Sequence, residues 1–143
     1  MKKIFFDANI LIDASDGTRP FHEAGKRLFD HLLANIEPYS LYTSCDLVTT
    51  IYYIFSKSLN TQEALNNIKL INNLIEIIEF GNDEISEAIE LMERNDKYVD
   101  LEDTIQYVMA RMSGCDYIIT NDKNFASGDV PTLTSEEALK ELQ

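Results

Sequence analysis

The sequence predicts an α/β fold with three layers, in which helices cover both faces of a central parallel sheet of about five short strands. Short apolar runs typical of strands alternate with longer segments whose apolar residues recur at helical spacing. Strands that alternate with helices are joined by crossovers, which make neighbouring strands parallel. Because the chain has 143 residues and is 45% apolar, we expect residues 1–143 to form one domain.

The first part of the chain predicts two strands, each followed by a helical segment. The apolar run at 3–7 predicts the first strand, and apolar residues three or four apart predict a helix over 20–35. Residues 40–43 predict a second strand. The polar residues at 43–46 can cap the helix that follows through Phe55.

The middle of the chain predicts a helix, a strand and another helix. Thr61 opens a segment with apolar residues at helical spacing through Ile75. Residues 76–80 predict the third strand, which Gly81 stops, and a helix is expected over 83–92.

The last part predicts two more strands around the most apolar helix. The helix is expected over 101–112, before Gly114, and is followed by a strand over 117–120. A short fifth strand is expected over 131–134. The final helix begins at Thr134 or Ser135, where the sequence Ser-Glu-Glu-Ala provides capping chemistry.

The net charge of −13, from 25 acidic and 12 basic residues, argues against nucleic-acid binding through a broad basic face. It does not exclude a nucleic-acid enzyme, because a bound divalent ion supplies local positive charge. The one compact basic group, Arg19, Lys26 and Arg27, is either a set of phosphate contacts or a solvated helix face.

We expect a cytoplasmic protein with no membrane segment. The apolar runs are far too short to span a bilayer. The start of the chain superficially resembles a signal peptide, but Asp7 and Asn9 interrupt its apolar core and no small-residue cleavage site follows. Cys45 and Cys115 have no disulfide or metal-site spacing.

Three acidic residues are expected at the rim where the carboxyl ends of the strands meet. Asp7 ends the first strand, Asp122 follows the fourth, and Asp103 lies in the first turn of the helix before it. Each has an ordinary explanation as a turn or helix-capping residue, which for Asp100 is the favoured one. Together at one rim, however, their mutual repulsion requires a counterion.

Carboxylates without histidine or cysteine partners suit Mg²⁺ or Mn²⁺, which keep several water ligands. Such an ion positions a phosphodiester, activates a water molecule and neutralises charge on the leaving oxygen. The acids therefore point to metal-dependent phosphoryl chemistry.

In order along the chain, these residues resemble the PIN-domain family, especially the VapC-type ribonuclease toxins of toxin–antitoxin modules. The matching segments are 6–13 (Phe-Asp-Ala-Asn-Ile-Leu-Ile-Asp), 103–110 (Asp-Thr-Ile-Gln-Tyr-Val-Met-Ala), 119–125 (Ile-Thr-Asn-Asp-Lys-Asn-Phe) and the closing 130–134. The likeness spans essentially the whole chain.

This resemblance implies a Mg²⁺- or Mn²⁺-dependent endoribonuclease with a PIN-like fold, an RNA substrate and a small antitoxin partner. It also implies that Asp7, Asp103 and Asp122 bind the metal. Asn9 would then support Asp7, and Thr120 or Asn121 would orient the site through hydrogen bonds. A homodimer is usual among such proteins, and the apolar helices around 52–55 and 68–75 are suited to one.

The sequence departs from the family pattern at Thr50, where relatives typically carry a glutamate. Asp46, one helical turn earlier, is a candidate replacement, as are Asp100 and Glu102. The remaining option is a site of three acids in which Thr50 contributes a hydroxyl or holds a water. The departure also leaves open a catalytically depleted PIN-like module that binds protein or RNA. A receiver-like domain is disfavoured because the third strand ends without an acceptor aspartate.

Overall fold

The computed structural model describes residues 1–142 and is built around a parallel five-stranded sheet with the strand order β3-β2-β1-β4-β5. The strands are β1 (Lys2–Phe6), β2 (Tyr39–Ser44), β3 (Glu76–Ile78), β4 (Tyr117–Ile119) and β5 (Thr132–Leu133). Every pairing in the sheet is parallel, which confirms the predicted sheet. The edge strands β3 and β5 are shorter than predicted, because each is paired along one side only.

Seven helices connect and cover these strands within residues 1–142. They are α1 (Ala8–Ser15), α2 (His22–Ala34), α3 (Cys45–Ser58), α4 (Thr61–Leu74), α5 (Asn82–Arg94), α6 (Leu101–Met112) and α7 (Ser135–Glu141). Apolar periodicity gives no bounds for α1, because most of this short helix is buried and it lacks a clear polar face. None of these helices combines the length and the apolar character that a membrane crossing needs.

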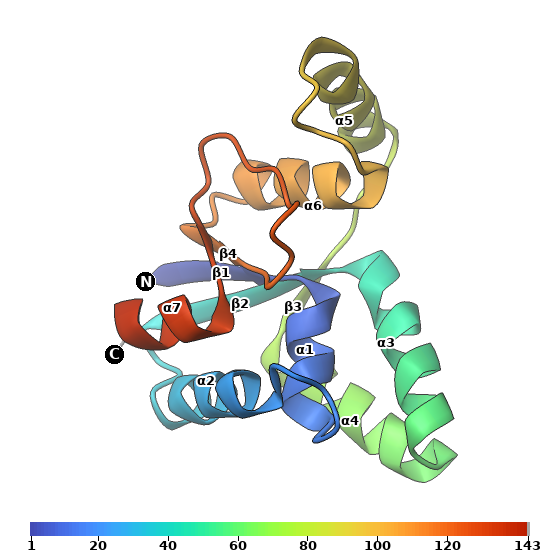
Figure 1. Cartoon of the computed structure of the whole chain (residues 1–143), viewed down its shortest axis with the longest axis vertical. Coiled ribbons are helices and arrows are strands. Elements are labelled where there is room, and N and C mark those ends of the chain that lie inside the picture. Colours follow the sequence, from blue (N-terminus) through green and yellow to red (C-terminus); the bar gives the residue numbers. More distant parts are fainter. Residues whose placement is uncertain (143) are drawn as a thin grey trace.

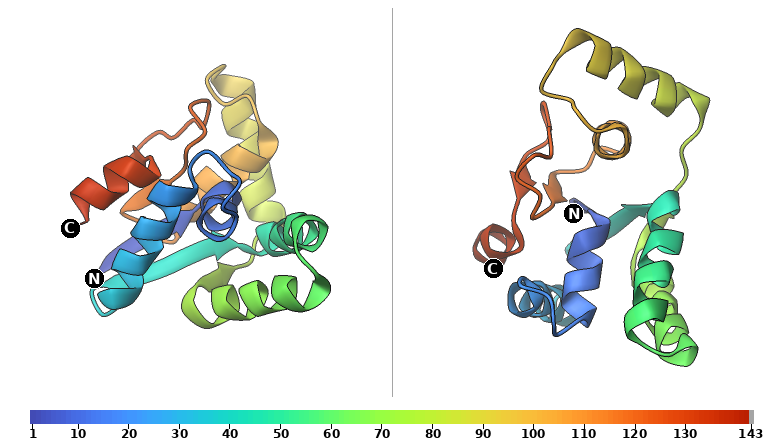
Figure 2. Two further views of the ribbon diagram at one scale, coloured as in Figure 1. Left: turned by 60° about the horizontal axis from the view of Figure 1, so that its bottom comes forward. Right: turned by 45° about the vertical axis from the view of Figure 1, so that its right-hand side comes forward.

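The helices form two layers, one on each face of the sheet. Helices α5 and α6 lie on one side, and α1, α2, α3, α4 and α7 on the other (Figure 1). In the right-hand view of Figure 2, α6 is seen along its axis, and α5 runs across the view above it. The expected three-layer α/β/α architecture is therefore confirmed.

The central strand β1 contributes to the cores of both layers. Ile4 and Phe6 pack with the five-helix layer, whereas Phe5 packs with α5 and α6. This alternation follows from the pleat of a strand, whose successive side chains point to opposite faces. All three side chains are fully buried, so β1 is the strand on which both cores are built.

Two local features fix the position of α6. At its start, the Asp100 carboxylate accepts a hydrogen bond from the backbone N–H of Asp103 at 2.9 Å, so the capping role expected for Asp100 is present. At its end, Gly114 adopts a φ of 71°, a left-handed conformation that glycine takes without steric cost. The chain thereby turns directly into β4.

We expect Phe6→Ala to lower the free energy of unfolding by about 3–5 kcal/mol, because it removes a fully buried ring that packs 5.0 Å from the ring of Phe29. Phe21→Ala is the matched control: Phe21 is exposed, and its truncation should change stability by about 0.5 kcal/mol or less. Urea denaturation followed by circular dichroism measures both. Equal losses would contradict the assigned core.

Candidate functional site

The crevice between the carboxyl ends of β1 and β4 is the switch point of the sheet. From β1 the chain continues to β2 on one side, whereas β4 lies on the other side. Ligand sites of open α/β sheets form at such points. Asp7 directly follows β1, and its backbone N–H donates to the carbonyl of Ile119, the last residue of β4, at 3.0 Å. Asp122 lies just beyond the same strand.

Thr120 links two of the predicted acids. Its hydroxyl Oγ1 donates to Oδ2 of Asp7 at 2.9 Å and accepts from the backbone N–H of Asp122 at 3.1 Å. Asp7 and Thr120 are only 5% and 4% exposed, so this hydrogen bond is shielded from water. The orienting role expected for Thr120 thus has a specific geometric basis.

The third acid, Asp103, is held in the first turn of α6 and is half-buried. Burial and the charges of Asp100, Asp7, Asp122 and Glu102 raise the pKa of its carboxyl to about 7. These charges act on Asp103 because the acids share one rim of the sheet.

Asp7 belongs to the same electrostatic group. Burial raises the pKa of its carboxyl above the usual value, the Asp122 charge adds to this effect, and the Thr120 hydrogen bond opposes it. Within residues 1–142, no lysine or arginine forms an ion pair with Asp7, Asp103 or Asp122. The rim is therefore a site of concentrated negative charge that a cation would stabilise.

The residues that could replace the glutamate found in relatives at the position of Thr50 have different surroundings. Thr50 is exposed, and its hydroxyl donates only to the Asp46 carbonyl at 3.5 Å. The Asp46 carboxylate accepts a hydrogen bond from the Ser44 hydroxyl, and Asp100 caps α6. The side chain of Glu102 makes no hydrogen bond to the rest of the described chain. Its pKa is raised by burial and then by the charges of Asp46, Asp100 and Asp7.

The donor set fits a hard, hydrated cation. In the part of the chain that the structure describes, no three histidine, cysteine, aspartate or glutamate side chains form a ready-made metal cage. Mg²⁺ and similar ions are commonly held by one or two carboxylates and keep several water molecules, so a closed cage is not required. Carboxylates alone, without nitrogen or sulfur donors, also favour these ions.

A buried glutamine on α6 adds an unusual polar group beside the acids. Gln106 is 1% exposed, and neither atom of its side-chain amide has a hydrogen-bond partner within residues 1–142. It lies one helical turn after Asp103, and helical side chains lean toward the preceding turn. An orphaned amide in this position fits a site that takes up water or a ligand.

The remaining predicted residues, Asn9 and Asn121, form part of the wall of the site. The Asn9 side chain is not hydrogen-bonded to Asp7, because its Oδ1 accepts from Arg19 at 3.4 Å, whereas a hydrogen bond from the Asn9 backbone lowers the pKa of the Asp7 carboxyl. Asn121 exchanges hydrogen bonds with Ser135, at 2.8 Å from its amide and 3.0 Å to its carbonyl oxygen, and donates to Asp13 at 3.4 Å. Asn121 therefore ties the start of α7 to α1.

Two features of this region were missed in the sequence. Asp13, only 2% exposed, forms an ion pair with Arg19 at 2.6 Å, and Gln106 is buried without a partner. The signal for Gln106 was a lone amide within the otherwise apolar segment 105–110. Asp13 gave a similar signal, as an acid at the end of the apolar run 10–12.

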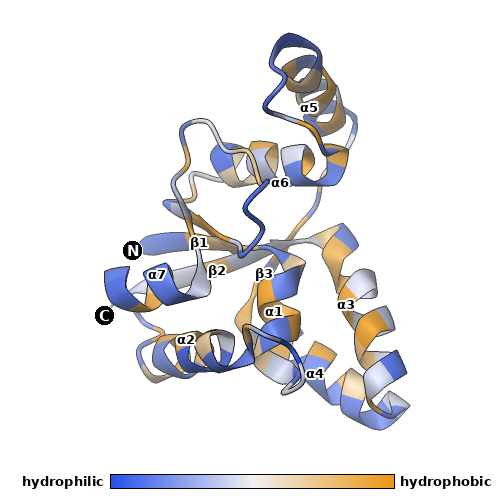
Figure 3. Ribbon diagram, in the orientation of Figure 1, coloured by the Kyte–Doolittle hydropathy of each residue, from blue (hydrophilic) through white to orange (hydrophobic). Residues whose placement is uncertain are grey.

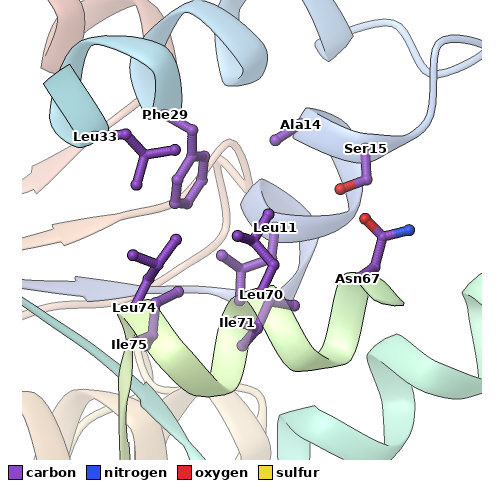
Figure 4. A pocket seen from close by; sticks show the side chains of 10 residues that line it. All are labelled: Leu11, Ala14, Ser15, Phe29, Leu33, Asn67, Leu70, Ile71, Leu74 and Ile75. Carbon is purple, nitrogen blue, oxygen red and sulfur yellow. The ribbon is translucent and has the colours of Figure 1, made fainter. Parts of the chain in front are cut away.

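A separate apolar groove lies between α1, α2 and α4, away from the acids. It has a volume of about 110 Å³, and Figure 4 shows its side chains converging from the three helices. Its apolar lining consists mainly of Leu11, Phe29, Leu33, Leu70, Leu74 and Ile75. Leu70 is 53% exposed, so its side chain is accessible to a partner.

Comparison with known proteins places this architecture in a family. The PIN domain model matches residues 4–130. Ribonuclease VapC1 of Aquifex aeolicus (strain VF5) is 46% identical over 136 residues, which cover 95% of this chain and 92% of that protein.

Solved structures with the same fold include toxins of this type. VapC20 of Mycobacterium tuberculosis, described as a sarcin-ricin loop cleaving toxin, has a TM-score of 0.68 at 18% identity and covers 85% of this chain and 92% of its own. DNA-bound VapBC from Salmonella typhimurium has a TM-score of 0.70 at 15% identity, covering 94% and 99%. The family model and the 46% identical relative show that the chain belongs to the PIN-domain family and is of the VapC type.

Proposed function

We propose that this protein is a Mg²⁺- or Mn²⁺-dependent endoribonuclease and the toxin of a toxin–antitoxin module. The observation that carries the proposal is the gathering of the Asp7, Asp103 and Asp122 charges at one rim without a basic partner. The 46% identity to a protein named as a ribonuclease supports RNA as the substrate.

In this proposal the three aspartates hold the ion, and Thr120 keeps the Asp7 carboxylate in the orientation needed to bind it. The ion supplies Lewis-acid stabilisation of charge on the phosphate and the leaving oxygen. Buried Asp7 fixes the ion against the sheet, whereas exposed Asp122 and half-buried Asp103 face the solvent side from which RNA approaches. One of the acids accepts the proton of the attacking water.

Glu102 is the best candidate to replace the glutamate that relatives carry at the position of Thr50. One carboxylate oxygen of Asp100 accepts the α6 cap hydrogen bond, and one of Asp46 accepts from the Ser44 hydroxyl. The Glu102 side chain has no such partner within residues 1–142; burial, and then the charges of Asp46, Asp100 and Asp7, raise the pKa of its carboxyl. Both of its carboxylate oxygens are therefore available to a cation.

The antitoxin is the expected protein partner, because several structural neighbours are toxin–antitoxin complexes. We assign its contact to the apolar groove between α1, α2 and α4 (Figure 4). An apolar helix face laid into this groove would cover Leu70 and Leu33. The groove is separate from the acids, so antitoxin binding and metal binding can be measured independently.

Homodimerisation stays a prediction. Figure 3 shows apolar stretches along α3, and Tyr53 on this helix is 58% exposed. Leu65 on the neighbouring α4 is 41% exposed. These residues mark the surface on which a second copy would pack.

Cleavage of a mixed RNA pool with Mn²⁺ tests the nuclease proposal. We expect cleavage by the parent protein, loss on addition of a chelator, and a fall of about 100-fold or more in rate for Asp7→Asn and Asp103→Asn. Glu102→Gln should reduce the rate more than Asp46→Asn. Glu93→Gln, on an exposed part of α5, is the control and should leave the rate unchanged.

Activity that survives both Asp7→Asn and Asp103→Asn would reject the metal-site assignment. No cleavage by the parent would instead favour the catalytically depleted module. If Asp46→Asn lowered the cleavage rate more than Glu102→Gln, Asp46 and not Glu102 would replace the glutamate that relatives carry at the position of Thr50.

The stability of the metal-free protein should fall as the pH rises from about 4 to about 7. The folded-state pKa of Asp103, about 7, lies above its ordinary value of 3.8, so the folded protein binds this proton more tightly than the unfolded chain. The resulting stabilisation is present at low pH and lost as the pH rises through 7. Melting temperatures between pH 4 and pH 8, measured in chelator, should show a shallower fall for Asp103→Asn. Parallel curves for the two proteins would contradict the raised pKa.

If a small antitoxin-like protein is encoded beside this gene, Leu70→Asp should abolish its copurification with this protein, because the substitution places a charge in the apolar groove. RNA cleavage by the isolated variant should remain. The control is Ile89→Asp, an exposed apolar residue of α5 that does not line this groove. Undiminished copurification with Leu70→Asp would place the antitoxin elsewhere.

A further inference from the structure

A second cavity adjoins the acids and has no role in the proposed chemistry. It has a volume of about 200 Å³ and is bordered by Asp122 on the side of the metal site. Its other walls include Asn9, Arg19, Phe21 and Asn121, from the start of α1, the loop before α2 and the loop after β4. One water molecule occupies about 30 Å³ of liquid, so the cavity has room for a larger chemical group.

Arg19 supplies a fixed positive charge in this cavity. Its Nε donates to the carboxylate of Asp13 at 2.6 Å, and Nη2 donates to Asn9 at 3.4 Å. Asp13 is nearly fully buried and holds the guanidinium in place, whereas the Arg19 side chain remains 30% exposed. Its Nη1 makes no hydrogen bond within residues 1–142, and a guanidinium is well shaped to bind phosphate oxygens.

Phe21 supplies an exposed aromatic ring at the edge of the same cavity. It is 48% exposed, although a phenylalanine gains stability from burial. Single-stranded RNA is commonly bound by stacking its bases on such rings, next to positive charges that contact the backbone. Phe21 and Arg19 lie two residues apart and both line the cavity.

The amides on either side have distinct roles. Both polar atoms of the Asn121 side chain are engaged with Ser135 and Asp13, so this residue stiffens the wall. The Asn9 carbonyl oxygen accepts from Arg19, which leaves the Asn9 amide N–H groups without a partner among the described residues. They can donate to an acceptor on the edge of a base.

The other two members of the basic group face elsewhere. Lys26 pairs with Asp30 at 2.8 Å on the exposed side of α2, and Arg27 borders, with Glu136, an adjoining cavity that shares Phe21 but not Asp122. A purely structural Asp13–Arg19 clamp explains the path of the loop before α2. It explains neither an open cavity beside Asp122 nor an exposed ring at its edge.

We propose that this cavity binds the RNA nucleotide next to the phosphodiester that is cleaved. Arg19 contacts the neighbouring phosphate, Phe21 stacks on the base and Asn9 donates to the base edge. The inference rests on the proposed nuclease function, because it takes the acids beside Asp122 as the cleavage site. It assigns to this protein a determinant of nucleotide preference.

The test measures binding of a fluorescein-labelled single-stranded RNA octanucleotide by anisotropy in EDTA, where metal-dependent cleavage cannot occur. Phe21→Leu keeps an apolar side chain but removes the ring, and it should raise the Kd about tenfold. Phe21→Tyr keeps the ring and should bind like the parent. Arg19→Lys should also weaken binding, because one ammonium cannot hold Asp13 and a phosphate with the same fork geometry. Arg94→Lys, on exposed α5, is its control.

Cleavage in Mn²⁺ provides the second measurement. Phe21→Leu should raise KM while kcat is retained, and mapped cut sites should show an altered base preference at one position flanking the cut. If the parent and Phe21→Leu share the same Kd, or the parent binds no octanucleotide, the subsite proposal is overturned. Phe21-dependent binding without cleavage would support the subsite and refute the nuclease function, so the two failures are distinguishable.

Discussion

Repulsion among carboxylates at the carboxyl ends of β1 and β4 is the constraint on which the rest of the site depends. The backbone fixes Asp7 in this position, because Asp7 directly follows the central strand and its N–H is hydrogen-bonded to the end of β4. The Thr120 hydroxyl offsets part of the cost by binding one oxygen of the buried carboxylate. At Asp103, burial and then the neighbouring negative charges raise the pKa of the carboxyl to about 7. Keeping this charge without a basic partner costs the protein stability, and the proposed cation would offset that cost.

In the proposed function, a cation at the negative rim and the neighbouring Arg19 both contribute to binding a polyanion such as RNA. A chain with a net charge of −13 gains little from long-range attraction to RNA. In the proposed function, local positive charge therefore comes from a bound ion and from an arginine whose geometry is fixed by buried Asp13. The hydrogen bonds of Asn121 to Ser135 connect this arrangement to α7, so the site wall also depends on the far end of the chain.

Apolar periodicity predicted the parallel sheet and the helices with apolar stripes. The rule that parallel strands end at one edge of the sheet predicted that Asp7, Asp103 and Asp122 share a rim. Helix α1 did not, because a mostly buried helix has no amphipathic pattern. The cap at Asp100 was predictable from local chemistry. The choice among Asp46, Asp100 and Glu102 was not, since it depends on which carboxylates are already hydrogen-bonded in three dimensions. The Asp13–Arg19 pair and the unpaired amide of Gln106 likewise depend on burial, which residue order alone does not show.

The central place of β1 has a consequence for the order of synthesis. Of the five strands, β1 is synthesised first, yet both of its neighbours, β2 and β4, are made later, and β4 begins only at Tyr117. Nascent chains that stop before this point expose one edge of β1 and lack Asp122 altogether. Long-range pairing of this kind is slow to form. The rim can therefore assemble only after Asp122 has been synthesised, and products truncated before this residue lack it.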